Sequence, residues 1–358
     1  MSETEPITVP YVALTGQPPG TPWPTDRWPT GDAPPGVPLG PLLDELFDDS
    51  GALATTYAAV VIYRGRLVAE RYAGELERWD GPAEQSGPDT RLLSWSIAKS
   101  MLHAVVGTLV GDGRLAVDAP APVPAWQGRD DPRRAITVQD MLEMRDGLDF
   151  VEQYVVGSPS DVIDMLFGSG QDDMAAFTEA KPLAVPPGSR FNYSSGTSNV
   201  ISAIVARSIG RGDAYRSYLE RRLFDPLGMT SALPGFDQAG TWVASSSVQA
   251  TARDFARFGY LYLRDGMWDG RRLLPEGWVD HGRFPRSVDP EDGALYGAHW
   301  WVVGDEHGSF RASGFEGQSI LISPGLDLVV VRMGKTPKER GPQLEQWRRR
   351  LTAAFAGY

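Results

Sequence analysis

A serine and a lysine stand three residues apart in the stretch SWSIAKSM, residues 94–101. On a helix such residues are neighbours, so the amine of Lys99 can reach the hydroxyl of Ser96. A neutral lysine amine can take the serine proton when burial or a nearby cation lowers its pKa, whereas arginine stays protonated. The chain uses arginine 30 times and lysine only four times. The spacing therefore predicts a nucleophile and its base, although a serine that merely caps a buried helix leaves the same pattern.

A tyrosine precedes two serines in FNYSSGTSNV, residues 191–200, where another helix is expected to begin. If it is held near Lys99, the phenol of Tyr193 can share a proton with the amine and relay it to a leaving group. The alternative is a tyrosine that packs against an edge from a Gly/Ser-rich loop. The pattern alone leaves both interpretations open.

Small residues occupy a predicted strand in RASGFEGQSILISP, residues 311–324. Ala312, Ser313 and Gly314 would let a substrate backbone approach closely. A free backbone N–H group at such an edge can donate a hydrogen bond to a developing oxyanion. The alternative is a twisted edge strand with a glycine bulge.

Several kinds of chemistry have no support in the sequence. There is no cysteine, which excludes disulfides, thiolate nucleophiles and cysteine-based zinc sites. The four histidines have no metal-ligand spacing, and neither a phosphate-binding glycine motif nor a GxSxG nucleophile elbow occurs. His103 lies two helical turns from Ser96, so we interpret it as a packed helix residue. We therefore predict neither a metal ion nor a cofactor.

Charge and hydropathy also limit the partners. The net charge is −12 and there is no Lys/Arg-rich run, which argues against nucleic acid and anionic membranes. No segment approaches the ~18 apolar residues typical of a membrane span. The N-terminal stretch MSETEPITVPYVALTG has two glutamates and no apolar core, unlike a secretory signal. We expect a cytoplasmic protein with a small-molecule substrate, and the sequence does not predict its oligomeric state.

These chemical groups need structural elements to position them. Residues 1–40 are rich in proline and glycine and predict an irregular arm, and Trp23 and Trp28 favour an arm that wraps the surface. Residues 55–74 predict a β-hairpin that turns at Arg64-Gly65. Apolar periodicity predicts helices over 41–49, 96–113, 137–147, 160–180, 197–210, 214–228, 250–266 and 343–356. Strands are expected over 297–305, 310–324 and 326–334.

Strands at both ends of the chain with helices between them predict an α+β fold. An antiparallel sheet built from both termini and flanked by helices would carry a mostly helical insertion. The expected divisions are an N-terminal arm over 1–44, an α/β domain over 45–95 and 240–358, and a helical domain over 96–239. Clefts tend to form where two such units meet, so we expect the active site at their interface.

Taken in this order, the three motifs resemble those of the serine β-lactamase and penicillin-binding protein superfamily, over about residues 45–357. Ser96–Lys99 matches the SxxK motif. Tyr193–Ser195 is similar to the YxN/YxS motif of the class C and esterase branch, and Ala312–Gly314 falls where KTG would be. The resemblance implies a β-lactamase/transpeptidase-like fold.

Finer features are similar to the branch of that superfamily with 6-aminohexanoate-dimer hydrolases and class C-like esterases. They lie at 251–266 and 317–331, and in the loop LDFVEQYVVGSPSDV. The resemblance implies that Ser96 attacks a carbonyl, while Lys99 and Tyr193 act as base and proton shuttle. It implies that the N–H groups of Ser96 and Phe315 bind the oxyanion. The residues it implies for substrate or oxyanion binding are Tyr154, Ser195, Ser313, Gly314 and Phe315.

One departure from the pattern bears on the substrate. Ala312 replaces the KTG lysine, which the resemblance assigns to holding the carboxylate of a β-lactam or peptide, and Arg311 would alternate to the other face of its strand. Glu316 is expected to place a negative charge near the cleft, which would suit a cationic or amine-bearing substrate. We therefore predict a serine hydrolase acting on an ester or non-lactam amide. The alternatives are an acyltransferase with the same acyl-enzyme, a true β-lactamase or D,D-peptidase, and a non-catalytic binding member of the fold.

Overall fold

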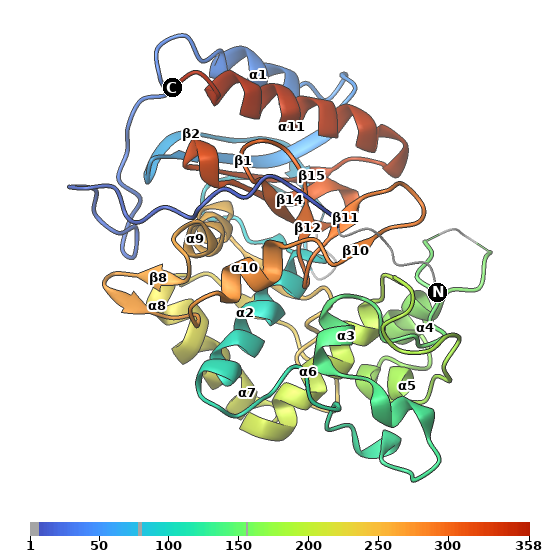
Figure 1. Cartoon of the computed structure of the whole chain (residues 1–358). Coiled ribbons are helices and arrows are strands. Elements are labelled where there is room, and N and C mark those ends of the chain that lie inside the picture. Colours follow the sequence, from blue (N-terminus) through green and yellow to red (C-terminus); the bar gives the residue numbers. More distant parts are fainter. Residues whose placement is uncertain (1–6, 78–80, 155–156) are drawn as a thin grey trace.

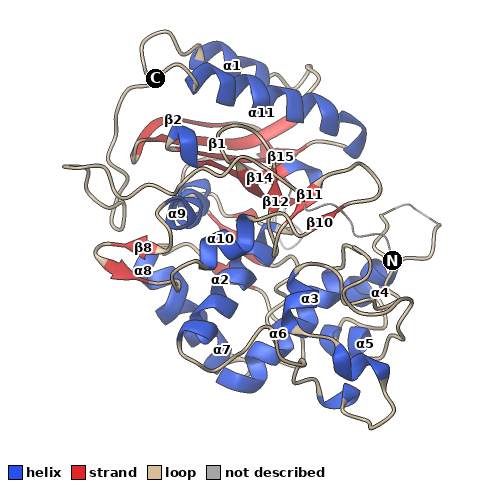
Figure 2. Ribbon diagram, viewed as in Figure 1, coloured by secondary structure: helices blue, strands red, loops and turns tan. Residues whose placement is uncertain are grey.

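The computed structural model of the chain describes residues 7–77, 81–154 and 157–358. Within these residues, the centre is an eight-stranded antiparallel sheet with strand order β10-β11-β12-β13-β14-β15-β1-β2 (Figures 1 and 2). Its strands are β1 (Thr55–Tyr63), β2 (Arg66–Tyr72), β10 (Ser287–Val288), β11 (Leu295–Tyr296), β12 (Trp301–Val302), β13 (Phe310–Gly314), β14 (Gln318–Ser323) and β15 (Leu328–Lys335). Strand β1 pairs with β15, which confirms the predicted sheet built from both ends of the chain.

Strand β1 is buried on both faces, so its sequence is an almost continuous apolar run. Successive side chains of a strand point to opposite faces. Val60 and Ile62 join the larger core between the sheet and the central helices, whereas Val61 and Tyr63 join a smaller core on the other face. Strand β2 follows through Arg64-Gly65, where both residues have positive φ (47° and 75°), and this confirms the predicted hairpin.

Helices cover both faces of the sheet (Figure 2). On one face lie α1 (Leu39–Leu46) and α11 (Gly341–Phe355), and the indole of Trp347 donates to the carbonyl of Leu42 at 2.9 Å. On the other face lie α2 (Ile97–Gly111), α9 (Ala252–Leu263) and α10 (Trp278–Arg283). Helix α9 approaches the sheet closely, because a Cβ atom at Gly259 would lie 2.5 Å from the side chain of Ile320.

A second group of helices lies beyond α2, at the end of the molecule opposite α11 (Figure 1). These are α3 (Val138–Leu142), α4 (Asp161–Phe167), α5 (Met174–Glu179), α6 (Ser195–Ile209), α7 (Asp213–Leu219) and α8 (Asp225–Leu227). Short strand pairs brace the connections: β3 (Glu75–Leu76) with β4 (Glu84–Gln85), β7 (Val248–Ala250) between β5 (Leu92–Leu93) and β6 (Leu233–Pro234), and β8 (Met267–Trp268) with β9 (Arg271–Arg272).

Several predicted elements are shorter than the sequence pattern indicated. The helix expected over 160–180 is two helices, α4 and α5, because the backbone at Gly168 turns away from helical geometry (φ −115°, ψ −135°). The helix expected over 137–147 ends at Leu142, just before Met144 adopts a positive φ of 56°. The strand expected over 297–305 is likewise shorter. His299 has a positive φ of 58°, which is incompatible with an extended strand, and only β12 (Trp301–Val302) forms.

The helix expected over 214–228 is also interrupted. Helix α7 ends at Leu219, and the chain continues through a π-helical turn over Glu220–Phe224 before α8. The other long helices agree closely with the predicted segments. Thr137 caps the N-terminus of α3, because its side chain accepts from the N–H of Asp140 in a reciprocal capping box.

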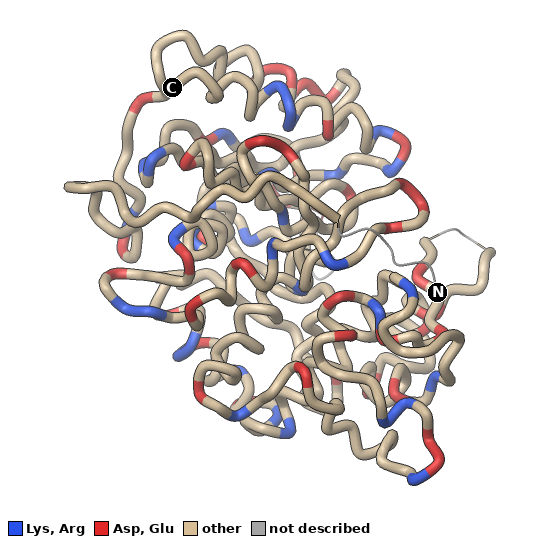
Figure 3. The backbone as a smooth tube through the Cα atoms, viewed as in Figure 1, with Lys and Arg blue, Asp and Glu red and all other residues tan. Residues whose placement is uncertain are grey.

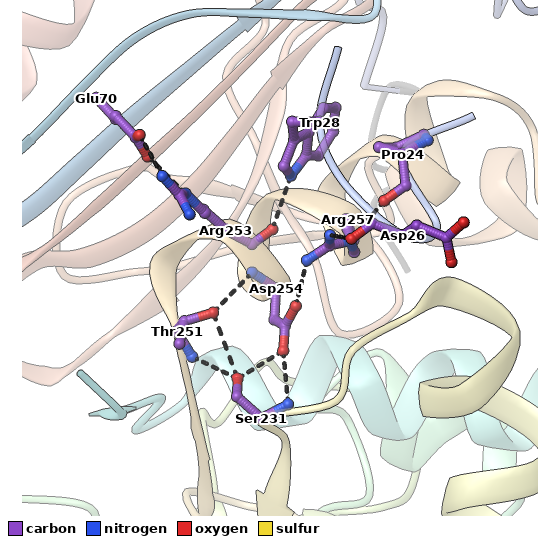
Figure 4. Close-up of polar contacts among 9 residues, drawn as sticks. All are labelled: Pro24, Asp26, Trp28, Glu70, Ser231, Thr251, Arg253, Asp254 and Arg257. Carbon is purple, nitrogen blue, oxygen red and sulfur yellow. Dashed lines mark hydrogen bonds and ion pairs between the residues drawn. The ribbon is translucent and has the colours of Figure 1, made fainter. Parts of the chain in front are cut away.

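The N-terminal arm, where it is described, packs against the body of the protein (Figure 4). The indole of Trp28 donates to the carbonyl of Arg253 on α9 at 3.2 Å, and the guanidinium of Arg257 donates to the carbonyl of Pro24 at 2.8 Å. Arg253 also pairs with Glu70 on β2, so one turn of α9 ties the arm to the sheet. The arm therefore wraps the surface over its described part, and residues 1–6 lie outside the described residues.

Acidic and basic residues are interspersed over the sheet layer and the helical region (Figure 3). In the described ranges, no helix combines the length and the hydropathy needed to cross a membrane.

Candidate active site

Ser96 lies at the N-terminal end of α2, where the chain turns sharply. The preceding residue, Trp95, has a positive φ of 45°, and the hydroxyl of Ser94 accepts from the N–H of Val248 on β7 at 3.0 Å. Ser96 occupies the N-cap position, but its side chain makes no capping hydrogen bond. Instead its Oγ atom lies 2.9 Å from the Nζ atom of Lys99. The Ser96 side chain therefore does not cap the helix, and its role as a nucleophile stays a prediction.

Lys99 is buried in α2, with 1% of its surface exposed. Its amine is within hydrogen-bond distance of three oxygen atoms: Ser96 Oγ at 2.9 Å, Ser195 Oγ at 3.0 Å and the carbonyl of Ser245 at 2.9 Å. Burial lowers the pKa of Lys99 to about 8, and the negative charge of Glu152 partly opposes this shift. The amine is thus held against the serine hydroxyl in surroundings that favour its neutral form.

Tyr193 comes from the loop before α6 and reaches the same place. Its ring centroid is 4.9 Å from Nζ of Lys99, and the ring stacks on Trp301 at 5.5 Å. Burial is the main reason that the pKa of Tyr193 is raised, and a hydrogen bond with Ser96 opposes the shift. The phenol therefore keeps its proton and can donate it at the reacting serine.

Ser195 is the first residue of α6 and links the lysine to a carboxylate. Its Oγ atom accepts from Lys99 and donates to Oε1 of Glu152 at 2.7 Å, while its backbone N–H also donates to Glu152. The hydroxyl of Tyr154 donates to the same carboxylate at 2.9 Å. Residues 155–156 of the predicted substrate loop lie outside the described residues.

The end of β13 lies beside Ser96. A Cβ atom at Gly314 would lie 2.5 Å from the carbonyl oxygen of Ser94, so only glycine allows this approach. Phe315 follows in the turn and packs its ring 5.5 Å from Trp95 and 5.1 Å from Tyr154. The role of the Phe315 N–H group as an oxyanion donor stays a prediction.

The remaining residues of this segment face in two directions. Ala312 is buried towards the larger core. On the opposite face, Arg311 pairs with Glu345 of α11 at 2.6 Å and donates to Oγ of Ser313 at 3.0 Å. The predicted orientation of Arg311 is confirmed, and the Ser313 side chain turns with it towards α11, so only the backbone of Ser313 can serve the cleft.

Glu316 lines a cavity of about 590 Å³ together with Trp95, Tyr154 and Phe315. Partial burial raises its pKa, against the opposing charges of Lys335 and Arg332. The expected acidic group near the cleft is therefore present. Its backbone is held in place as well, because the carbonyl of Glu316 accepts from Arg332 at 3.0 Å and from the N–H of Thr336 at 2.9 Å.

His103 takes no part in this cluster. Its ring is fully buried, lies 2.8 Å from the hydroxyl of Tyr262 and 3.1 Å from His281, and stacks on Trp278. Its interpretation as a packed helix residue is confirmed. Over the ranges that the structure describes, no group of three or more His, Cys, Asp or Glu side chains is placed to hold a metal ion.

Sequence reasoning missed two residues of the cluster. Glu152 lies two positions before Tyr154 in the quoted loop, and an acidic residue beside a proposed substrate contact was a usable signal. Ser245 contributes only a backbone carbonyl, which any residue supplies, so the sequence carried no signal for it. Together the cluster can move a proton from Ser96 to Lys99 and generate a serine alkoxide.

A sequence model of the Beta-lactamase family matches residues 43–355 of the chain. Among characterised proteins, the chain is 28% identical over 359 residues to a 6-aminohexanoate-dimer hydrolase of Paenarthrobacter ureafaciens, covering 90% of this chain and 83% of that protein. Among solved structures, it is similar to a penicillin-binding protein homologue from Caulobacter crescentus (TM-score 0.70, 19% identity, 91% of this chain and 99% of that chain). It is also similar to a family VIII carboxylesterase (TM-score 0.68, 16% identity, 89% of this chain and 98% of that chain). The two structural likenesses show a shared fold.

Proposed function

The chain belongs to the beta-lactamase family, in its class C-like part, and from this premise we propose that it hydrolyses an ester or a non-lactam amide through an acyl-enzyme on Ser96. The observation that carries the proposal is the 2.9 Å contact between the Ser96 hydroxyl and the buried amine of Lys99. A lysine whose pKa is about 8 is neutral in roughly a tenth of the molecules at pH 7 and in more of them as the pH rises, so it can act as a base.

The proposed reaction has two halves. First, Lys99 takes the proton of Ser96, the serine oxygen attacks the substrate carbonyl, and Tyr193 donates its proton to the leaving alcohol or amine. The N–H groups of Ser96 and Phe315 would hold the oxyanion that forms. The ammonium of Lys99 then returns its proton to the Tyr193 phenolate, which restores both groups. Second, a water molecule attacks the acyl-enzyme carbonyl while Lys99 takes one of its protons, and Lys99 passes that proton to the serine oxygen as the acid leaves.

The choice of an ester or non-lactam amide rests on the strand beside the nucleophile. Ala312 is buried where the family's motif would place a lysine, and the neighbouring Arg311 is paired with Glu345 on the other face of the sheet. This edge therefore offers no cation for the carboxylate of a β-lactam. The names of a curated relative, a 6-aminohexanoate-dimer hydrolase, and of a structural neighbour, a carboxylesterase, fit the same choice.

Intact-protein mass spectrometry after reaction with a fluorophosphonate tests the proposal. We expect one phosphonyl group per chain, on the peptide that contains Ser96, and turnover of p-nitrophenyl esters or simple amides in preference to β-lactams. The matched control is the Ser96→Ala variant, which should gain no mass. Absence of labelling in a folded wild-type protein, together with absence of ester and amide turnover, would refute the proposed function.

A further inference from the structure

The cavity beside Ser96 has an apolar wall that is open to solvent. Of the nine large apolar residues exposed in the described part of the chain, four line this cavity: Tyr154 (46% exposed), Ile163 (42%), Phe167 (54%) and Phe315 (43%). Exposed apolar residues gathered in one place are typical of a binding site, since leaving them in water is unfavourable. The cavity, at about 590 Å³, is large enough for more than the reacting carbonyl group.

This wall reaches the residue next to the proposed nucleophile. Trp95 lines the cavity and directly precedes Ser96, and its ring packs on that of Phe315. Tyr154 packs on the other side of Phe315 and bonds through its hydroxyl to Glu152, which leads through Ser195 to Lys99. A substrate whose carbonyl lies at Ser96 therefore has the apolar wall within reach.

The charges around the cavity are mostly negative. Its charged lining residues, within the described ranges, are two glutamates and one lysine: Glu77, Glu316 and Lys335. The single cation is already 3.7 Å from the carboxylate of Glu77. A carboxylate on the substrate would meet more repulsion than attraction there, whereas an uncharged or cationic group would not.

We infer that this cavity binds an apolar chain of the substrate, on the acyl or the leaving side of the scissile bond, and disfavours a chain that ends in a carboxylate. The inference rests on the proposed function and names its substrate class. Transfer of each methylene from water to an apolar wall should raise kcat/KM about three- to fourfold, or about 100-fold from an acetyl to a hexanoyl ester.

The test uses two series of esters on the full-length protein. One series lengthens the acyl chain with a constant p-nitrophenol leaving group, and the other lengthens the alcohol with a constant acyl group. A rise in kcat/KM along either series supports the inference and identifies the side that the cavity takes. Phe167→Ala should flatten that rise, whereas Phe284→Ala, which removes an exposed phenylalanine outside the cavity, should not.

Charge is tested with hexanoyl-length esters that end in a methyl, an ammonium or a carboxylate group. We expect the carboxylate-ended ester to have a kcat/KM lower than the neutral ester by about tenfold or more, and Glu316→Gln to narrow the difference. Two flat series, or a preference for the carboxylate, would overturn the inference. If fluorophosphonate still labels Ser96, those results leave the proposed function intact.

A separate observation concerns the direction of the protons around Lys99. A neutral amine has two N–H donors and one lone pair, and Lys99 faces three oxygen atoms. The carbonyl of Ser245 can only accept, so it takes one N–H. The hydroxyl of Ser195 donates its proton to Glu152, so towards Lys99 it can also only accept. The lone pair is left facing Ser96.

We infer that Glu152 is a positioning residue, because its carboxylate orients the Ser195 hydroxyl and thereby points the Lys99 lone pair at the nucleophile. This inference also rests on the proposed function. Three donors converge on the carboxylate, namely the N–H and Oγ of Ser195 and the hydroxyl of Tyr154, and they hold its orientation. The competing explanation is a purely structural one, in which Glu152 only caps the N-terminus of α6.

Glu152→Gln separates the two explanations. The glutamine side chain must turn an N–H group towards one of the three donors that the carboxylate accepts from. The Ser195 hydroxyl then loses its fixed direction. We therefore expect kcat to fall about 10- to 100-fold. The variant also removes the negative charge that raises the pKa of Lys99, so the acid limb of kcat/KM should move to lower pH. Two other described ionisable groups face Lys99. The pKa of Tyr193 is raised, and burial lowers the pKa of His299 to about 3, so neither group titrates on the acid limb of kcat/KM.

The control is Ser194→Ala. Ser194 is the N-cap of the same helix, and its side chain accepts from the N–H of Thr197, so the substitution removes the cap without touching Glu152. It should lower the melting temperature and leave the pH profile unchanged. If Glu152→Gln behaves like this control, with a lower melting temperature but unaltered kcat and acid limb, the positioning role is wrong. Fluorophosphonate labelling of the variant shows that the nucleophile is still present.

Discussion

Replacing Ser96 with alanine is expected to lower kcat for ester hydrolysis by about 10⁴-fold or more, to the level of background hydrolysis. In the proposed reaction the substitution removes the oxygen that attacks the carbonyl. The fold should be retained, because the Ser96 side chain makes no capping hydrogen bond whose loss would destabilise the helix. Steady-state kinetics with a p-nitrophenyl ester and a thermal melt followed by circular dichroism measure the two effects.

The control for this prediction is Ser100→Ala, one turn further along α2. The hydroxyl of Ser100 donates to the carbonyl of His299 at 2.7 Å, away from Lys99. Its loss should cost about 1 kcal/mol of stability and change kcat only a few-fold. A Ser96→Ala protein that still turns over the ester at the wild-type rate would show that another residue is the nucleophile.

Replacing Lys99 with arginine is expected to reduce kcat by about 10²- to 10⁴-fold although the positive charge is kept. Arginine remains protonated at every pH that the protein tolerates, so it cannot accept the Ser96 proton. Lys99→Met should be equally inactive, because it retains the length of the side chain without the amine. Because burial disfavours the charged form of this amine, its removal should leave the melting temperature unchanged or raise it.

The pH dependence of the wild-type protein belongs to the same prediction. The base works only when it is neutral, so kcat/KM should rise with pH up to about 8, near the pKa of Lys99, and fall as the amine is protonated below it. Kinetics between pH 5 and 9 on wild type and Lys99→Arg, with melts at each pH, give both results. Wild-type activity in the arginine variant would reduce Lys99 to a structural cation.

The part of this site that local geometry determines was predictable from the sequence. Ser96 and Lys99 are three residues apart on one helix, so their contact needs only the helix to form. The hairpin at Arg64-Gly65 and the helix that buries Lys99 follow likewise from turn chemistry and apolar periodicity. The α+β fold with an antiparallel sheet was predictable from the strands expected at both ends of the chain.

Other features depend on contacts that sequence patterns do not encode. The break between α4 and α5 follows from the backbone at Gly168, although the apolar residues on either side continue a helical pattern. Glu152 reaches Ser195 from a different loop, and Ser245 contacts Lys99 through its backbone carbonyl. The spacing of residues in the sequence therefore predicts neither contact. Ser313 was predicted to lie beside the substrate because it is small. In the strand, however, its side chain points towards α11.

The pairing of β1 with β15 has a consequence for how the protein is made. The guanidinium of Arg332 donates to the hydroxyl of Thr56, 276 positions away, and the two strands pair along nearly their whole length. During synthesis β1 leaves the ribosome long before its partner β15, because the whole helical region is made between them. Until then the apolar β1 has only β2 beside it, a state that favours aggregation and engagement by chaperones. Assembly of the catalytic cleft must therefore wait until β15 has been made.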